Sequence, residues 1–148
     1  MIKPINDYPK LTIEESAYLA GLIDGDGAIR IRKVSDRKRQ RYQPSVYFCN
    51  TNKEVIDWIR IKLKNTGSLK ENIPSKNSHL RWWRIEWVTA QARNVIEQIL
   101  PYLIVRKNNA IRAIELSKYQ FDPIKQEELL QLCKTGSGHK QLNQFGRI

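Results

Sequence analysis

The chain has 148 residues, and its 26 Lys and Arg against 15 Asp and Glu give a formal net charge of +11. This length fits one domain with a real core, and the basic excess favours a polyanionic partner such as nucleic acid or an anionic membrane surface. The N-terminus lacks a signal-peptide core, no apolar run reaches the ~20 residues of a membrane span, and two cysteines cannot form a disulfide framework or a zinc site.

The first predicted element is a helix. Thr12 followed by Glu15 is a capping box, so a helix should start there and run to Asp24, where glycines stop it. This helix is apolar nearly all round, which predicts burial against the chain's own core and against a second copy. Its small residues recur every four positions and allow two helix backbones to approach closely, although packing in the core is the alternative. These residues are Ala17, Gly21 and Gly25.

The segment after this helix predicts a hairpin and a second helix. Residues 27–34, GAIRIRKV, alternate apolar and basic side chains, which is typical of a half-buried strand. A polar basic loop over residues 35–40 should connect it to a second strand over residues 41–50. Thr51 with Glu54 forms a further capping box and predicts a helix that closes at Gly67.

The remainder predicts another hairpin and three more helices. SLKENI and LRWWRIEWV read as strands, Thr89 should cap the helix AQARNVIEQIL, another helix starts near Arg106, and Asp122–Pro123 opens the last. The order predicts one α+β domain over residues 1–135, with a four-stranded antiparallel sheet and helices on one face. Residues 136–148 form a polar tail to which no element is assigned.

The sheet should have one apolar and one basic face. Alternation places Trp83, Ile85 and Trp87 on one side of a strand and Trp82, Arg84 and Glu86 on the other. A solvated polar face is the ordinary alternative. However, residues 30–41 hold seven basic residues and one acid, so the sheet face and the adjoining loop are both positively charged, which a merely solvated surface does not require. Strand arginines should read guanine edges and loop residues should hold phosphates. The predicted DNA-binding residues are Arg30, Arg32, Lys33, Arg37, Lys38, Arg39, Arg41, Lys70, Trp82 and Arg84.

Two aspartates stand at the C-terminal end of the first predicted helix. A carboxylate there is disfavoured by about 0.3–1 kcal/mol, so Asp24 and Asp26 need a positive partner. Nearby arginines could supply it, but a divalent cation fits better, because Mg²⁺ takes one or two carboxylates together with phosphate oxygens and water. Two copies meeting along the small-residue stripe would each contribute one carboxylate to a shared centre. This arrangement predicts a two-fold symmetric phosphodiesterase.

The stretch LAGLIDGDG, Leu19 to Gly27, resembles the signature of the LAGLIDADG homing endonucleases and departs from the family name only at Gly25. The motif occurs once, so the chain is similar to single-motif members that act as homodimers. The resemblance implies an αββαββα fold whose concave sheet face binds DNA. It also implies Mg²⁺ held by Asp26 and the backbone carbonyl of Gly25, with Mn²⁺ as a substitute and Ca²⁺ as an ion that binds without cleavage.

The resemblance implies further roles near the metal. Asp24 would hold the helix end, and Asn52 would order a water, with helix capping as its alternative role. Arg106 would act electrostatically near the scissile phosphate, with Lys107 as the other candidate. His79 and His139 stand in no metal-ligand spacing, which disfavours histidine-based nucleases.

The implied activity is a staggered double-strand break in a pseudo-palindromic DNA target of about 20 base pairs, by metal-dependent phosphodiester hydrolysis. An intron maturase, which assists RNA splicing, and a DNA-binding module that does not cleave are the alternatives on the same fold. The expected location is the cytoplasm of a prokaryote or the matrix of a mitochondrion or chloroplast, without secretion.

Overall fold

The computed structural model describes residues 8–37, 39–76 and 80–135, and within them it confirms the predicted α+β class. Two 3₁₀ turns, η2 (Leu100–Tyr102) and η3 (Leu116–Tyr119), flank the fourth helix. The helices and strands in chain order are α1 (Ile13–Asp26), β1 (Gly27–Asp36), β2 (Arg39–Asn50), α2 (Lys53–Lys62), β3 (Ser68–Asn72), β4 (Trp82–Val88), α3 (Thr89–Ile99), α4 (Lys107–Glu115) and α5 (Pro123–Thr135).

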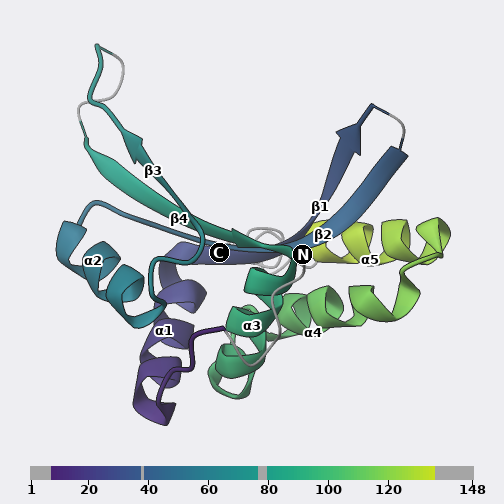
Figure 1. Cartoon of the computed structure of the whole chain (residues 1–148), viewed down its shortest axis with the longest axis horizontal. Helices are drawn as coiled ribbons and strands as arrows, with labels where there is room; N and C mark the ends of the chain where they lie inside the picture. The colour runs from purple at the N-terminus through teal and green to yellow at the C-terminus, as the bar shows by residue number, and fades with distance from the viewer. Residues whose placement is uncertain (1–7, 38, 77–79, 136–148) are drawn as a thin grey trace, which may run out of the picture.

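The four strands form one antiparallel sheet in the order β1-β2-β4-β3. The two hairpins rise as two arms, so the sheet is concave above, and the helices lie beneath it (Figure 1). This arrangement follows from the strand pattern, because an alternating strand has one face that must be buried against helices.

The two faces of the sheet match the predicted alternation. On β4, Trp83, Ile85 and Trp87 are buried against the helices, whereas the residues between them are only partly buried. The core also includes side chains from β1, β2 and all five helices, among them Ile29, Val46, Phe48, Leu19, Ile23, Ile59, Ile96, Ala110 and Leu130. The concave face is therefore left free of the helical layer.

The capping box of α1 is confirmed, but the helix is longer than predicted. The Glu15 backbone N–H donates to Thr12 Oγ1 at 3.1 Å, and the Thr12 backbone N–H donates to Glu15 Oε1 at 2.8 Å. The helix runs past Asp24 and ends at Asp26. Gly27 follows it as the first residue of β1, where a Cβ atom would come within 2.6 Å of the Tyr47 carbonyl oxygen.

Two other predicted caps are wrong. Asn52, not Thr51, caps α2, because its Oδ1 accepts the backbone N–H groups of Glu54 and Val55 at 2.8 and 3.3 Å. Thr89 does not cap α3 either: it is the first helical residue, has a φ of +54°, and donates its hydroxyl to the Val88 carbonyl. Since β4 enters α3 without a linker, the change of direction falls on Thr89 itself.

The predicted loop over residues 35–40 is too long. Ser35 pairs with Gln40 and Asp36 with Arg39, so both strands extend toward the tip of the hairpin. Arg39 is consequently a strand residue. Lys38, His79, His139 and the tail over residues 136–148 lie outside the described residues.

The described residues include no disulfide and no membrane-spanning helix. Cys49 and Cys133 are free thiols, and burial raises the pKa of the Cys133 thiol to about 11, which keeps it protonated. Across the described ranges, none of the helices has both the length and the apolar character needed to cross a membrane.

Candidate nucleic-acid interface and metal centre

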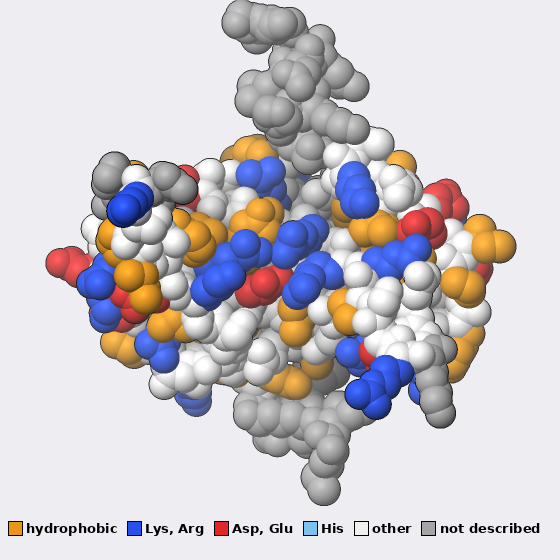
Figure 2. Space-filling view, turned by 90° about the horizontal axis from the view of Figure 1, so that it is seen from above, with side chains coloured by type: hydrophobic (Ala, Val, Ile, Leu, Met, Phe, Trp, Pro, Cys, Tyr) orange, Lys and Arg blue, Asp and Glu red, His pale blue; other side chains and the backbone are white. Residues whose placement is uncertain are grey.

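Basic side chains gather across the middle of the concave face (Figure 2). Arg30 and Arg32 come from β1 and Arg84 from β4, and Lys70 of β3 is paired with Arg84 in the sheet. Cross-strand partners share a face, so Arg41, which pairs with Val34, belongs to the same side of the β1–β2 hairpin. The sheet thus brings basic residues from all four strands to one surface.

An acidic residue lies at the centre of this basic surface. Glu86 Oε2 accepts the Ser45 hydroxyl at 2.6 Å, Arg30 Nη2 at 3.1 Å and Arg32 Nη1 at 3.3 Å. Its Oε1 lies 3.6 Å from Arg84 Nη2. Burial raises the pKa of Glu86, but the hydrogen bonds from Ser45 and Arg30 and the two positive charges outweigh it, so the pKa is lowered.

Tyr47 completes this cluster from β2. Its ring lies 3.9 Å from the guanidinium carbon of Arg84 and 4.9 Å from that of Arg30. Both arginines therefore make cation–π contacts with the same ring. Sequence reasoning missed the roles of Tyr47 and Ser45, because nothing local to residues 45–47 reveals which charged side chains other strands will bring to them.

Lys33 does not join the concave face. It pairs with Tyr42 in the hairpin, its Nζ lies 3.3 Å from Glu127 of α5, and it sits 5.5 Å from the Tyr42 ring centre. It follows Ile29 and Ile31 on the helical side of β1, as period-two alternation requires. Its hydrogen bond to Glu127 raises its pKa.

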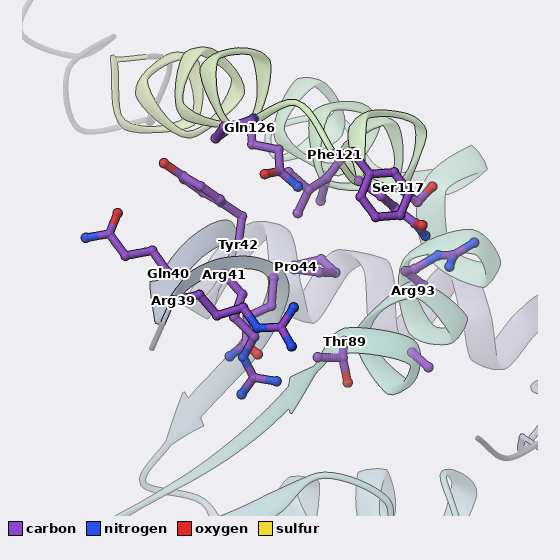
Figure 3. A pocket seen from close by; sticks show the side chains of 16 residues that line it. Arg39, Gln40, Arg41, Tyr42, Pro44, Thr89, Arg93, Ser117, Phe121 and Gln126 are labelled. Atoms are coloured by element: carbon purple, nitrogen blue, oxygen red, sulfur yellow. The ribbon is translucent and has the colours of Figure 1, made fainter. Parts of the chain in front are cut away.

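A hollow of about 520 Å³ lies away from the aspartates, between β2, the start of α3 and the turn from η3 to α5. Arg39, Arg41 and Arg93 line it, together with Tyr42 and Phe121 (Figure 3). Asp24 and Asp26 are not among its lining residues, so it is distinct from the metal site predicted at the end of α1.

Asp26 is exposed at the end of α1 and contacts Asn50, the last residue of β2. Asn50 Nδ2 donates to Asp26 Oδ2 at 3.2 Å, and Asn50 Oδ1 accepts the backbone N–H of Asn52 at 2.8 Å. Asn52 itself is occupied in capping α2. Asn50, which is absent from the predicted site residues, is therefore the polar side chain beside Asp26. The pairing of Gly27 with Phe48 places it there, because it aligns the end of β2 with the end of α1, and the sequence does not reveal this register.

Asp24 has a different environment from Asp26. Its Oδ2 accepts the backbone N–H of Ile104 at 2.8 Å, and its Oδ1 accepts that of Arg106 at 2.9 Å. These bonds tie the end of α1 to the segment that precedes α4. Two backbone donors thus supply the positive partners that Asp24 needs, while Asp26 keeps an exposed carboxylate.

The two basic candidates near α4 also differ. Arg106 is partly buried and lines a groove with Ala28, Arg30 and Arg32, beside the strand that begins just after Asp26. Its Nε is buried and has no hydrogen-bond partner among the described residues. Lys107 begins α4, is exposed, and does not line this groove.

The small-residue stripe of α1 faces away from the core. Ala17, Gly21 and Gly25 are exposed, and a Cβ atom added at either glycine would have nothing within 4 Å. Tyr18, which is 53% exposed, stands beside the stripe with its ring 4.9 Å from that of Trp58. Within one chain, α1 is therefore buried only on the side that faces the core, and the second buried side predicted from its sequence would require a second copy.

The donors at the end of α1 suit a hard cation but are incomplete in one chain. The Asp26 carboxylate and the Gly25 carbonyl are oxygen donors, which Mg²⁺ prefers. Among the described residues, no group of three His, Cys, Asp or Glu side chains gathers to hold a metal. A centre at Asp26 therefore needs ligands from outside the chain, such as phosphate oxygens, water and a second copy's carboxylate.

No protein-family model matches the sequence, and no curated protein matches it. Solved structures do. The homing endonuclease I-CvuI, in complex with its target in the presence of Ca, has a TM-score of 0.66 at 18% identity, over 92% of this chain and 97% of that one. The archaeal intron-encoded homing endonuclease I-Vdi141I, complexed with DNA, has a TM-score of 0.66 at 16% identity, over 84% of both chains.

A third match concerns a longer protein. The LAGLIDADG homing endonuclease I-GzeII, in complex with its DNA target, has a TM-score of 0.57 at 15% identity, over 90% of this chain and 49% of that one. The chain thus has the fold of the LAGLIDADG homing endonucleases and spans about half the length of I-GzeII.

Proposed function

We propose that this chain is a LAGLIDADG homing endonuclease that acts as a homodimer and makes a staggered double-strand break in DNA by metal-dependent hydrolysis. The observation that carries the proposal is the exposed Asp26 carboxylate at the end of α1, next to a basic concave sheet. The solved structures that share the fold are homing endonucleases with DNA. Among the described residues no basic side chain forms an ion pair with Asp26, so this carboxylate would only repel phosphates in a module that bound DNA without cleaving it.

Dimerisation would complete the site. The exposed stripe on α1 lets two copies of the helix pack closely, and α1 ends at Asp26, so a two-fold axis along the stripe would bring two Asp26 carboxylates together. A symmetric dimer binds a pseudo-palindromic target, one half-site per copy.

The proposed chemistry divides between the metal and the chain. Bound Mg²⁺ would neutralise charge on the scissile phosphate and make its water more acidic. Asp26 and the Gly25 carbonyl would hold the ion, and Asn50 would keep the Asp26 carboxylate in place through its amide. Arg106, in the groove beside Ala28, would attract the phosphate without transferring a proton, because a guanidinium stays charged at neutral pH.

The size of the sheet agrees with a long target. β1 has ten residues, which at ~3.3 Å per residue span roughly 33 Å, about ten base pairs. Two half-sites of this length make a target of about 20 base pairs.

The direct test is cleavage by the wild-type protein. A supercoiled plasmid that carries the joined exon sequences flanking the gene should be cut in both strands with Mg²⁺ or Mn²⁺ and remain intact with chelator or Ca²⁺. Tight binding to this junction without cleavage in Mg²⁺ or Mn²⁺ would defeat the nuclease and leave the maturase or the binding module. Splicing assays on the intron RNA would then separate those two.

The hairpin tip and the centre of the concave face should contribute differently to binding. Arg37→Ala removes a tip charge, so we expect weaker binding to all sequences alike and a plot of log K against log[salt] that is flatter by ~1. Arg84→Ala removes a side chain from the centre of the sheet, so we expect relaxed discrimination of ~1–3 kcal/mol at one base pair per half-site. Fluorescence anisotropy with single-mismatch duplexes measures both, and the opposite pattern would reverse the assignment.

A further inference from the structure

The arginine cluster of the concave face is built around one carboxylate. Glu86 is paired with Tyr47 in the sheet, and Arg30 is paired with Ser45, so β4, β2 and β1 place these side chains side by side. Every polar contact of the cluster meets at Glu86: the Ser45 hydroxyl and Arg30 and Arg32 on Oε2, and Arg84 on Oε1.

A carboxylate in this position needs an explanation, because it repels the phosphates that the surrounding arginines attract. Stability is a weak reason, because the Glu86 side chain is largely buried and the cost of desolvating its charge offsets much of the attraction to the arginines. Solubility is not a reason either, because a net charge of +11 is far from zero whether or not this carboxylate is present.

The geometry also argues against direct base reading by Glu86. Its side chain is 17% exposed, whereas those of Arg30 and Arg32 are each 41% exposed, so the carboxylate lies below the guanidinium groups. Oε2 already accepts three donors, and Oε1 faces Arg84. An incoming cytosine amino group would have to displace an arginine to reach it.

The arginines, in contrast, keep donors for DNA. Glu86 engages one terminal nitrogen of each guanidinium, Nη2 of Arg30, Nη1 of Arg32 and Nη2 of Arg84. The Nε atoms of Arg30 and Arg84 are buried, so in both side chains the second terminal nitrogen is the donor left for DNA. The cation–π contacts with the Tyr47 ring further restrict the orientation of the Arg30 and Arg84 guanidinium groups. Three flexible side chains are thus held before DNA arrives, which lowers the entropy cost of a bidentate contact to guanine.

We propose that Glu86 is a positioning residue that sets the sequence preference of Arg30, Arg32 and Arg84 without contacting a base. This inference rests on the proposed DNA-binding function and deepens it. It predicts that specificity depends on an acidic side chain whose removal strengthens attraction to DNA in general.

The test compares two variants with the same charge change. Glu86→Gln and Glu71→Gln each remove one negative charge from the sheet, but Glu71 is on β3, pairs with Arg81 and is aligned with the buried Trp83, away from the cluster. Each protein selects duplexes from a randomised library, and anisotropy then measures binding to the selected site and its single-base variants. Both substitutions should strengthen binding to unrelated DNA, but only Glu86→Gln should lower discrimination, by about fivefold or more at the base pairs read by the cluster.

A third variant separates position from charge. Glu86→Asp keeps the charge but shortens the side chain, so we expect it to lose discrimination as Glu86→Gln does, without the general gain in affinity. Thermal denaturation checks that each variant is folded. Selection of the same bases by wild type, Glu86→Gln and Glu86→Asp would overturn the inference, and so would a change confined to one C·G pair with the arginine-read positions intact, which indicates direct reading.

The same selection distinguishes this inference from the proposed function. Wild-type protein that enriches no sequence would defeat site-specific DNA binding itself, and the inference would fall with it. Wild-type enrichment of a long symmetric site with unchanged variant profiles would overturn the role of Glu86 alone.

Discussion

Asp26→Asn is expected to abolish cleavage of both DNA strands while leaving DNA binding intact. Asn keeps the shape of the side chain and an oxygen that can accept the Asn50 amide, but it removes the charge that holds the metal. Loss of several kcal/mol of transition-state stabilisation corresponds to a rate lower by about a thousandfold or more. Affinity for the target in the absence of metal should stay the same or rise, because one negative charge leaves the DNA-facing side.

Asp24→Asn is the matched control, because it removes a carboxylate two residues earlier on the same helix. Its loss weakens the bonds from the Ile104 and Arg106 backbone N–H groups, so we expect a lower free energy of unfolding, by about 1–3 kcal/mol. Plasmid cleavage and thermal denaturation of both variants measure the contrast. Full cleavage by Asp26→Asn would move the metal site elsewhere in the protein.

Gly21→Leu is expected to convert the dimer to a monomer and thereby to abolish cleavage. Gly21 is exposed, and a Cβ atom there meets nothing in its own chain, so leucine fits the single subunit. Leucine also favours a helix over glycine by roughly 0.8 kcal/mol, so the subunit should be at least as stable as the wild type. Between two closely packed helices, however, the added side chain forces the backbones apart.

Sedimentation equilibrium measures the change in oligomeric state. Gln131→Leu adds the same side chain to an exposed position of α5, away from α1, and should leave the dimer intact. A dimer that tolerates Gly21→Leu would show that its interface lies elsewhere. A monomeric wild-type protein would remove the basis for a shared metal centre.

Local patterns are sufficient for the order of elements and for the two faces of the sheet. The alternation at residues 82–88 assigns Trp83 and Trp87 to the core, and Thr12 with Glu15 marks the start of α1. These features depend on residues at most a few positions apart, where backbone geometry determines which side chains share a face. The motif at residues 19–27 likewise indicates the fold that the solved structures share.

The partners of individual polar side chains depend on contacts between segments far apart in the chain. Asn50 meets Asp26 across 24 residues, Asp24 receives the Arg106 N–H across 82, and Arg30 meets Glu86 across 56. Strand register and the packing of α1 against the segment before α4 create these contacts, and no periodicity encodes them. Lys33 combines both levels: the period-two alternation of β1 assigns it to the helical side, but its ion pair with Glu127 depends on where α5 packs.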